Sequence, residues 1–125
     1  MASRTIHAAL TLGALAAATL LFAFDPAVTW WFPSCPLNAL TGWLCPFCGS
    51  LRALHAMLHG APGAAWAQNP LTTAGTSAGL VAVALDAVWP ARATHTGRLL
   101  SWCLSARGLT LAAAFGVLRN VGWRW

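Results

Sequence analysis

Most of the side chains that could do chemistry in this chain lie in one short segment, residues 35–60. Cys35, Cys45 and Cys48 fall within fourteen positions, and the last two belong to the turn Cys-Pro-Phe-Cys-Gly. Clustered thiolates bind zinc or iron, and a pair of thiols can also form a disulfide. The spacing therefore predicts a metal site or a thiol–disulfide centre in this loop.

A short helix directly after the turn would bring imidazoles toward these thiols. Ser50 can cap a helix over residues 51–59. Arg52, His55 and His59 follow the spacing i, i+3, i+7 and would share one face of that helix. Either histidine could join the three cysteines in a set of three thiolates and one imidazole, which is a known structural zinc pattern. Zinc is therefore the candidate cofactor, with the three cysteines and the two histidines as candidate ligands.

Prolines stiffen the loop that positions the cysteines. Pro33, Pro36 and Pro46 fix their own φ angles and restrict the residues before them to extended geometry. The Cys-rich loop and the short helix, residues 33–60, belong to a connector of about 45 residues between two apolar runs. Connectors of that length are usually functional or have structure of their own, so we expect the functional site here.

The composition predicts that lipid surrounds most of the chain, whose 125 residues suit a single membrane domain, residues 1–125. Hydrophobic residues make up 58% of the chain and charged residues only 7%, far below the share in a soluble domain. So few charges cannot cover a surface that faces water. The arginines are scattered singly and form no basic face, which argues against a nucleic-acid partner despite the net charge of +5.

Three apolar runs predict membrane spans. Residues 6–24, 71–89 and 99–121 each approach the roughly 20 residues that a helix needs to cross a bilayer. Arg107 interrupts the third run. The predicted fold is all-α, with three transmembrane helices and one short interfacial or re-entrant helix after the Cys-rich loop. The first run could instead be a cleaved signal peptide, but it is long for that purpose and lacks a small-x-small site, so we expect it to be retained.

The arginines leave the orientation in the membrane open. With the N-terminus inside, three would lie on each side: Arg4, Arg92 and Arg98 inside, and Arg52, Arg119 and Arg124 outside. Because the first helix usually dominates, we expect the N-terminus inside a plasma or inner membrane. The chain would then be a multi-pass protein with its Cys-rich loop outside the cytoplasm.

Two features predict contacts of the spans. Asp86 and Arg107 would lie at similar depth if the second and third spans form a hairpin, and an ion pair would offset the cost of each charge in lipid. Alternatively, each side chain reaches to its nearer interface. Gly75 and Gly79 form a small-xxx-small face, which suits helix packing within the chain, self-association or contact with other membrane proteins.

The run CPLNALTGWLCPFCGSLRALHAMLHG, followed by Asn-Pro-Leu at residues 69–71, resembles the bacterial family called domain of unknown function 2752. Its members resemble this chain in being short, multi-span membrane proteins with a CP…LTGxxCPxCGxxRA…LHG…NPL signature. Arg52 and Asn69 stand within that signature and are further functional candidates. The late pair Arg119-Asn120 resembles a common ending of the family. The resemblance implies the architecture and assigns no activity.

Three functions stay open. The first is a non-enzymatic accessory or scaffold protein whose cysteines form a structural disulfide, and the second is a metal knuckle, although zinc sites usually carry two Cys-x-x-Cys pairs and this chain has one. The alternative is a membrane thiol-disulfide oxidoreductase that uses the Cys45-Cys48 pair, with Cys35 as the resolving thiol. That enzyme lacks a second pair unless Cys103 is brought near. We favour a structural Cys/His motif over catalysis and keep the oxidoreductase as the alternative.

Overall fold

The computed structural model describes residues 2–89 and 95–122, and this part of the chain consists of seven helices without any strand. They are α1 (Ala2–Ala23), α2 (Pro36–Thr41), α3 (Ser50–Leu58), α4 (Pro62–Gln68), α5 (Pro70–Val88), α6 (His95–Cys103) and α7 (Ala106–Val121). The all-α prediction is therefore confirmed. Of the arginines expected to bear on orientation, Arg92 and Arg124 lie outside the described residues.

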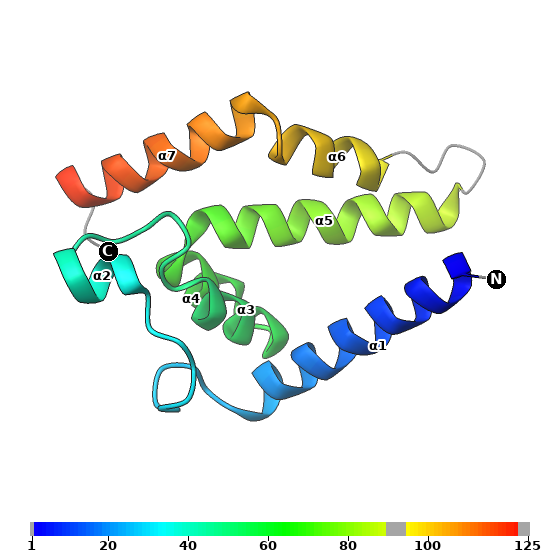
Figure 1. Ribbon diagram of the computed structural model, residues 1–125, viewed down its shortest axis with the longest axis horizontal. Helices are drawn as coiled ribbons and strands as arrows, with labels where there is room; N and C mark the ends of the chain where they lie inside the picture. Colours follow the sequence, from blue (N-terminus) through cyan, green and yellow to red (C-terminus); the bar gives the residue numbers. More distant parts are fainter. Residues whose placement is uncertain (1, 90–94, 123–125) are drawn as a thin grey trace.

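Helix α5 lies at the centre of the arrangement (Figure 1). Helices α6 and α7 follow one side of it, and α1 diverges from it on the other side. The short helices α3 and α4 pack against each other and against α5, while α1 contacts α3. As a result, the Cys-rich loop, α3, α4, the start of α5 and the end of α7 all gather at one end of the molecule.

The buried side chains are small or polar, whereas the large apolar side chains are exposed. Ala53, Ala65 and Ala82 are the buried hydrophobic residues of the described chain, and the largest fully buried side chain is that of Asn69. In contrast, Trp30 is 88% exposed, and leucines, valines and tryptophans of most helices are exposed as well. A hydrophobic core of the kind that stabilises soluble domains is therefore missing from the described residues.

One helix is long and apolar enough to cross a membrane, and it is α5. Helices α6 and α7 qualify only if they are taken together as one span, which is bent by 57°. In α1, the apolar helical stretch identified is Thr11–Ala23, which is shorter than a span requires. The structure thus supports one spanning helix, or two with the bent pair, rather than the three predicted.

The predicted span over residues 99–121 is wrong as a single helix, because the chain breaks between α6 and α7. Ser105 caps α7, and its side-chain oxygen accepts a hydrogen bond from the backbone N–H of Gly108. A Cβ atom on Gly108 would lie 2.4 Å from the carbonyl oxygen of Cys103, so the bend requires glycine at this position. The Ser-x-x-Gly pattern was the local signal for a helix end within the apolar run.

Asp86 is paired with the start of α6 and not with Arg107. Its Oδ1 atom accepts from the backbone N–H of His95 and lies 2.8 Å from the His95 ring nitrogen. Its Oδ2 atom accepts from the backbone N–H and the hydroxyl of Thr96. Arg107 is exposed near the bend. The predicted ion pair is therefore replaced by a carboxylate that satisfies the free N–H groups at a helix N-terminus.

The connector between α1 and α5 has structure of its own, as its length predicts. The helix expected over residues 51–59 is confirmed as α3, which begins at Ser50 and ends at Leu58. The predicted cap is wrong, because the N-cap is Gly49 and no side chain caps the helix. Two further helices, α2 and α4, were not predicted, and both begin with a proline at the first helical position.

Candidate metal centre

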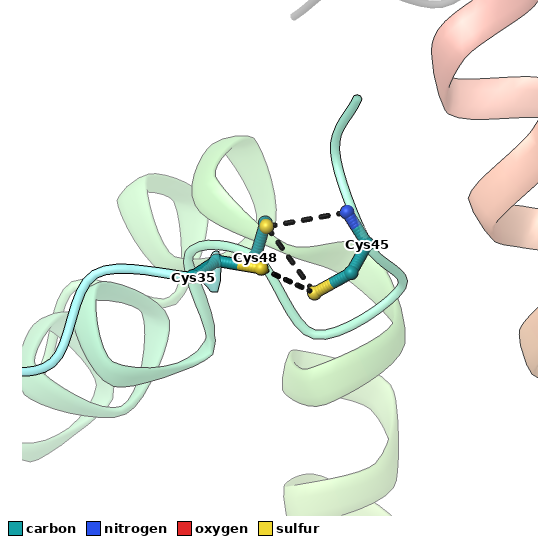
Figure 2. A group of neighbouring side chains, drawn as sticks. All are labelled: Cys35, Cys45 and Cys48. Atoms are coloured by element: carbon teal, nitrogen blue, oxygen red, sulfur yellow. Dashed lines mark hydrogen bonds between the residues drawn. The ribbon is translucent and has the colours of Figure 1, made fainter. Parts of the chain in front are cut away.

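The three cysteines of the loop converge in the structure. The sulfur of Cys45 lies 3.4 Å from that of Cys35 and 3.2 Å from that of Cys48, and all three sulfurs lie within 4.8 Å of one another (Figure 2). Zinc–sulfur bonds of about 2.3 Å in a tetrahedron place sulfur atoms about 3.8 Å apart, whereas a disulfide needs about 2.05 Å. The group therefore has the spacing of three metal ligands, and each thiol is free.

Local backbone structure fixes each sulfur. Cys35 stands directly before α2, whose first residue is Pro36. Cys45 and Cys48 enclose a tight turn, in which the backbone N–H of Cys48 donates to the carbonyl of Cys45 at 3.0 Å. The backbone N–H of Cys45 points back to the sulfur of Cys48 at 3.2 Å (Figure 2). The turn thus holds two sulfurs on one side, and the extended residue before α2 brings in the third.

Asn69 holds this turn from inside the molecule. Its side-chain nitrogen donates to the carbonyl oxygens of Pro46 at 2.9 Å and Cys48 at 3.1 Å. Its side-chain oxygen accepts from the backbone N–H of Thr72 and so caps α5. Asn69 is 0% exposed. This candidate residue therefore positions the cysteines and starts the central helix with one amide group.

Arg119 near the end of α7 holds the same turn from the other side. Its guanidinium donates to the carbonyl of Cys48 at 2.6 Å and to the carbonyl of Gln68 at 2.9 Å. The side chain is 8% exposed, so the charge is buried against backbone oxygens. Gly49 lets the cysteine turn approach the carbonyl of Gln68 closely. A Cβ atom on Gly49 would lie 2.8 Å from that carbonyl oxygen, and its φ of +83° also favours glycine.

Asn120 binds the loop just before Cys45. Its side-chain nitrogen donates to the carbonyl of Leu44 at 2.8 Å, and its side-chain oxygen accepts from the N–H of Leu44 at 2.9 Å. The sequence linked Arg119 and Asn120 to a family ending without assigning them a contact. Two adjacent polar residues at the end of an apolar helix were the available signal, since such groups need partners when they are buried.

The two candidate histidines lie elsewhere. The Nδ1 atom of His55 is hydrogen-bonded to the carbonyl of Leu21, and the ring of His59 stacks on Phe22 with 4.4 Å between ring centroids. The metal-ligand group found among the described residues consists of the three cysteines alone. The predicted set of three cysteines and one histidine is therefore corrected to the three cysteines without a histidine. Within the predicted helical face, His55 and His59 turn toward α1 and fix α3 to it.

A hollow of about 550 Å³ opens beside the sulfurs. All three cysteines line it, together with Ser50, Arg52 and Arg119. Among the described residues Arg52 is exposed and has neither an ion pair nor a side-chain hydrogen bond. None of the lining residues in the described part of the chain is acidic. The predicted functional residue Arg52 thus shares a basic hollow with the three thiols.

The thiols differ in acidity. The backbone N–H of Asn38, followed by the neighbouring thiols of Cys48 and Cys45, lowers the pKa of Cys35 to about 7. Burial, followed by the thiols of Cys45 and Cys35, raises the pKa of Cys48 to about 12. A divalent cation would bind all three as thiolates and release their protons.

Cys103 takes no part in the group. It is exposed on α6, and the group of close sulfur atoms does not include it. All four cysteines of the chain lie within the described residues, so the structure offers no second thiol pair. The relay that a membrane thiol oxidoreductase requires therefore has no structural support.

Comparison with known proteins identifies the segment that carries the centre. No curated protein and no solved structure matches this chain. Residues 35–83 match a family described as "Protein of unknown function (DUF2752)". The matched range begins at the first cysteine of the centre and ends within α5. The match to the DUF2752 family of unknown function therefore covers the Cys-rich loop, α3, α4 and most of α5.

Proposed function

We propose that this chain is a membrane accessory or scaffold protein whose Cys35, Cys45 and Cys48 bind a structural zinc ion. The observation that carries the proposal is the convergence of the three sulfurs within 4.8 Å of one another. Thiolates are soft ligands that select zinc among the common divalent cations that have no redox chemistry.

The contacts around the loop support a structural role for the ion. Asn69 and Arg119 both donate to the carbonyl of Cys48, and Asn120 pairs with Leu44. The loop therefore joins the start of α5 to the end of α7. The buried side chains are small or polar and form little hydrophobic core. A bound metal ion would therefore supply folding free energy that a hydrophobic core supplies in other proteins.

The exposed surface supports a location in lipid. Leucines, valines and phenylalanines cover the outside of α1, α5 and α7, and in water such a surface would cause aggregation. We propose that α5 and the bent α6–α7 pair each cross a plasma or inner membrane, with the Cys-rich loop on the outer side. Exposed tryptophans such as Trp31, Trp66 and Trp89 would lie at the headgroups.

Zinc analysis tests the metal proposal. The full-length protein is purified in detergent with a phosphine reductant and without chelator, and its zinc content is measured by mass spectrometry. We expect about one zinc per chain, and less than about a tenth of that in Cys45→Ser or Cys48→Ser. Cys103→Ser is the matched control and should keep its zinc. A wild-type protein without zinc, or full zinc in both loop variants, would refute the proposal.

Membrane extraction tests the location separately. Alkaline carbonate releases peripheral proteins and leaves integral proteins in the pellet. We expect the chain to stay in the pellet and to dissolve only in detergent. Release into the carbonate supernatant would rule out the membrane role. The metal proposal would still be tested by the zinc analysis.

A further inference from the structure

Within residues 2–89 and 95–122, the metal centre has three protein ligands and no fourth. His55 and His59 face α1, and among the described residues the group contains no histidine, aspartate or glutamate. Zinc with three protein ligands keeps its fourth position open to a ligand from outside. The hollow of about 550 Å³ that all three cysteines line gives such a ligand room to approach.

The charges around the hollow select the kind of ligand. Of the residues that the structure describes, two arginines line it and no acidic residue does. The guanidinium of Arg119 is already bound to the carbonyls of Cys48 and Gln68. Arg52 is exposed and has no partner in the described part of the chain, so its charge is available to an anion.

We infer that a small acidic thiol completes the centre, with its thiolate on the metal and its carboxylate on Arg52. This inference rests on the proposed metal centre. A fourth sulfur matches the soft character of the three sulfurs already present. The planar guanidinium fits a carboxylate with two parallel hydrogen bonds. On binding, the thiol gives its proton to the solvent and its sulfur displaces a water molecule, so no oxidation or reduction takes place.

Cobalt substitution tests the inference, because the absorption bands of Co²⁺ report how many sulfurs bind it. The zinc of the full-length protein in micelles is exchanged for Co²⁺, and the protein is titrated with mercaptoacetate or with the neutral thiol mercaptoethanol. We expect mercaptoacetate to produce the bands of a four-sulfur site in a saturable way. Cobalt content after desalting must stay constant, since loss of the ion to the added thiol would contradict the inference.

Arg52 variants test the role of the charge. Arg52→Gln should lower the affinity for mercaptoacetate by about three- to fivefold, as expected for an exposed ion pair. It should change the affinity for mercaptoethanol by less than about twofold. Arg52→Lys keeps the charge and should lose less affinity than Arg52→Gln. Arg98→Gln on α6 is the matched control, because Arg98 is exposed and does not line the hollow.

The outcomes separate this inference from the proposed function. A protein that binds no Co²⁺ and no zinc refutes the metal centre itself. A protein that binds Co²⁺ but whose spectrum responds to neither thiol has a closed site, which overturns the inference and leaves the metal centre standing. Equal binding of both thiols, unaffected by Arg52→Gln, also overturns it, because the arginine would then select nothing.

Discussion

The side-chain amide of Asn120 pairs with both backbone groups of Leu44, as a neighbouring strand would. The two hydrogen bonds measure 2.8 and 2.9 Å and join residues that are 76 positions apart. The same nitrogen also donates to the carbonyl of Gly116 in its own helix. The end of α7 is therefore fixed to the backbone immediately before Cys45, which couples helix packing to the metal centre.

Loss of the hydrogen bonds between Asn120 and Leu44 should destabilise the protein at the Cys-rich loop. Asn120→Ala leaves the N–H and the carbonyl of Leu44 without partners in a part-buried position, which costs about 1–3 kcal/mol of unfolding free energy. Denaturant titration in micelles measures the loss. Asn38→Ala is the matched control, because the Asn38 side chain is exposed and bonds only to the carbonyl of Gly42. Equal stability of the two variants would contradict the pairing.

Substitution of Asn69 by alanine should lower the free energy of unfolding more than the same substitution of Asn120. Asn69→Ala takes the donor from the carbonyls of Pro46 and Cys48 and removes the cap of α5. The expected loss is about 2–4 kcal/mol, from one helix cap and buried carbonyls left unpaired. Asn69→Asp keeps the cap but places a carboxylate oxygen against the same two carbonyl oxygens in a buried site, so it should destabilise the protein at least as much as Asn69→Ala. A wild-type unfolding curve for Asn69→Ala would show that the amide holds nothing.

The contact between α7 and the cysteine turn requires glycine at position 116. A Cβ atom on Gly116 would lie 2.9 Å from Cγ of Pro46, in the middle of the metal-binding turn. Gly116→Ala should therefore destabilise the protein by about 1–3 kcal/mol and lower its zinc content. Gly75→Ala in α5 is the control, since nothing lies within 4 Å of its Cβ position. Equal free energies of unfolding for the two variants would mean that α7 does not pack on Pro46.

The thiols of the metal-free protein should react in a fixed order. The pKa of Cys35 is lowered to about 7 by the Asn38 backbone, and that of Cys48 is raised to about 12 by burial. A lowered pKa means that the thiolate persists down to about neutral pH, so Cys35 should react with iodoacetamide first at about pH 8. Its rate should fall with a midpoint near its pKa as the pH drops, while Cys48 stays protonated. Peptide mapping by mass spectrometry would contradict this order if Cys48 reacted as fast as Cys35.

The convergence of the cysteines was predictable because local chemistry fixes it. A Cys-x-x-Cys turn brings its own two sulfurs together, and the prolines around it leave the loop few conformations. Helix α3 was predictable for the same reason, since its apolar stripe and its end lie within residues 51–60, although its N-cap is Gly49 and not the predicted Ser50. In these cases the sequence neighbours are also the spatial neighbours.

The predictions that were wrong depended on which helices pack next to each other in the fold. The spacing placed His55 and His59 on one face of α3, but only the position of α1 decides that this face meets Leu21 and Phe22. Asp86 was expected to pair with Arg107, but it accepts from the backbone N–H groups of His95 and Thr96 at the start of α6 instead. Helix periodicity gives the direction of a side chain relative to its helix and says nothing about the neighbour it meets.

The centre itself can be measured directly by X-ray absorption at the zinc edge of the purified full-length protein, reduced with a phosphine so that no added thiol is present. We predict three sulfur neighbours at about 2.3 Å and one lighter atom at about 2.0 Å. A shell of nitrogen and oxygen alone would contradict the account. So would a sample that holds no zinc and in which Cys45 and Cys48 are joined as a disulfide.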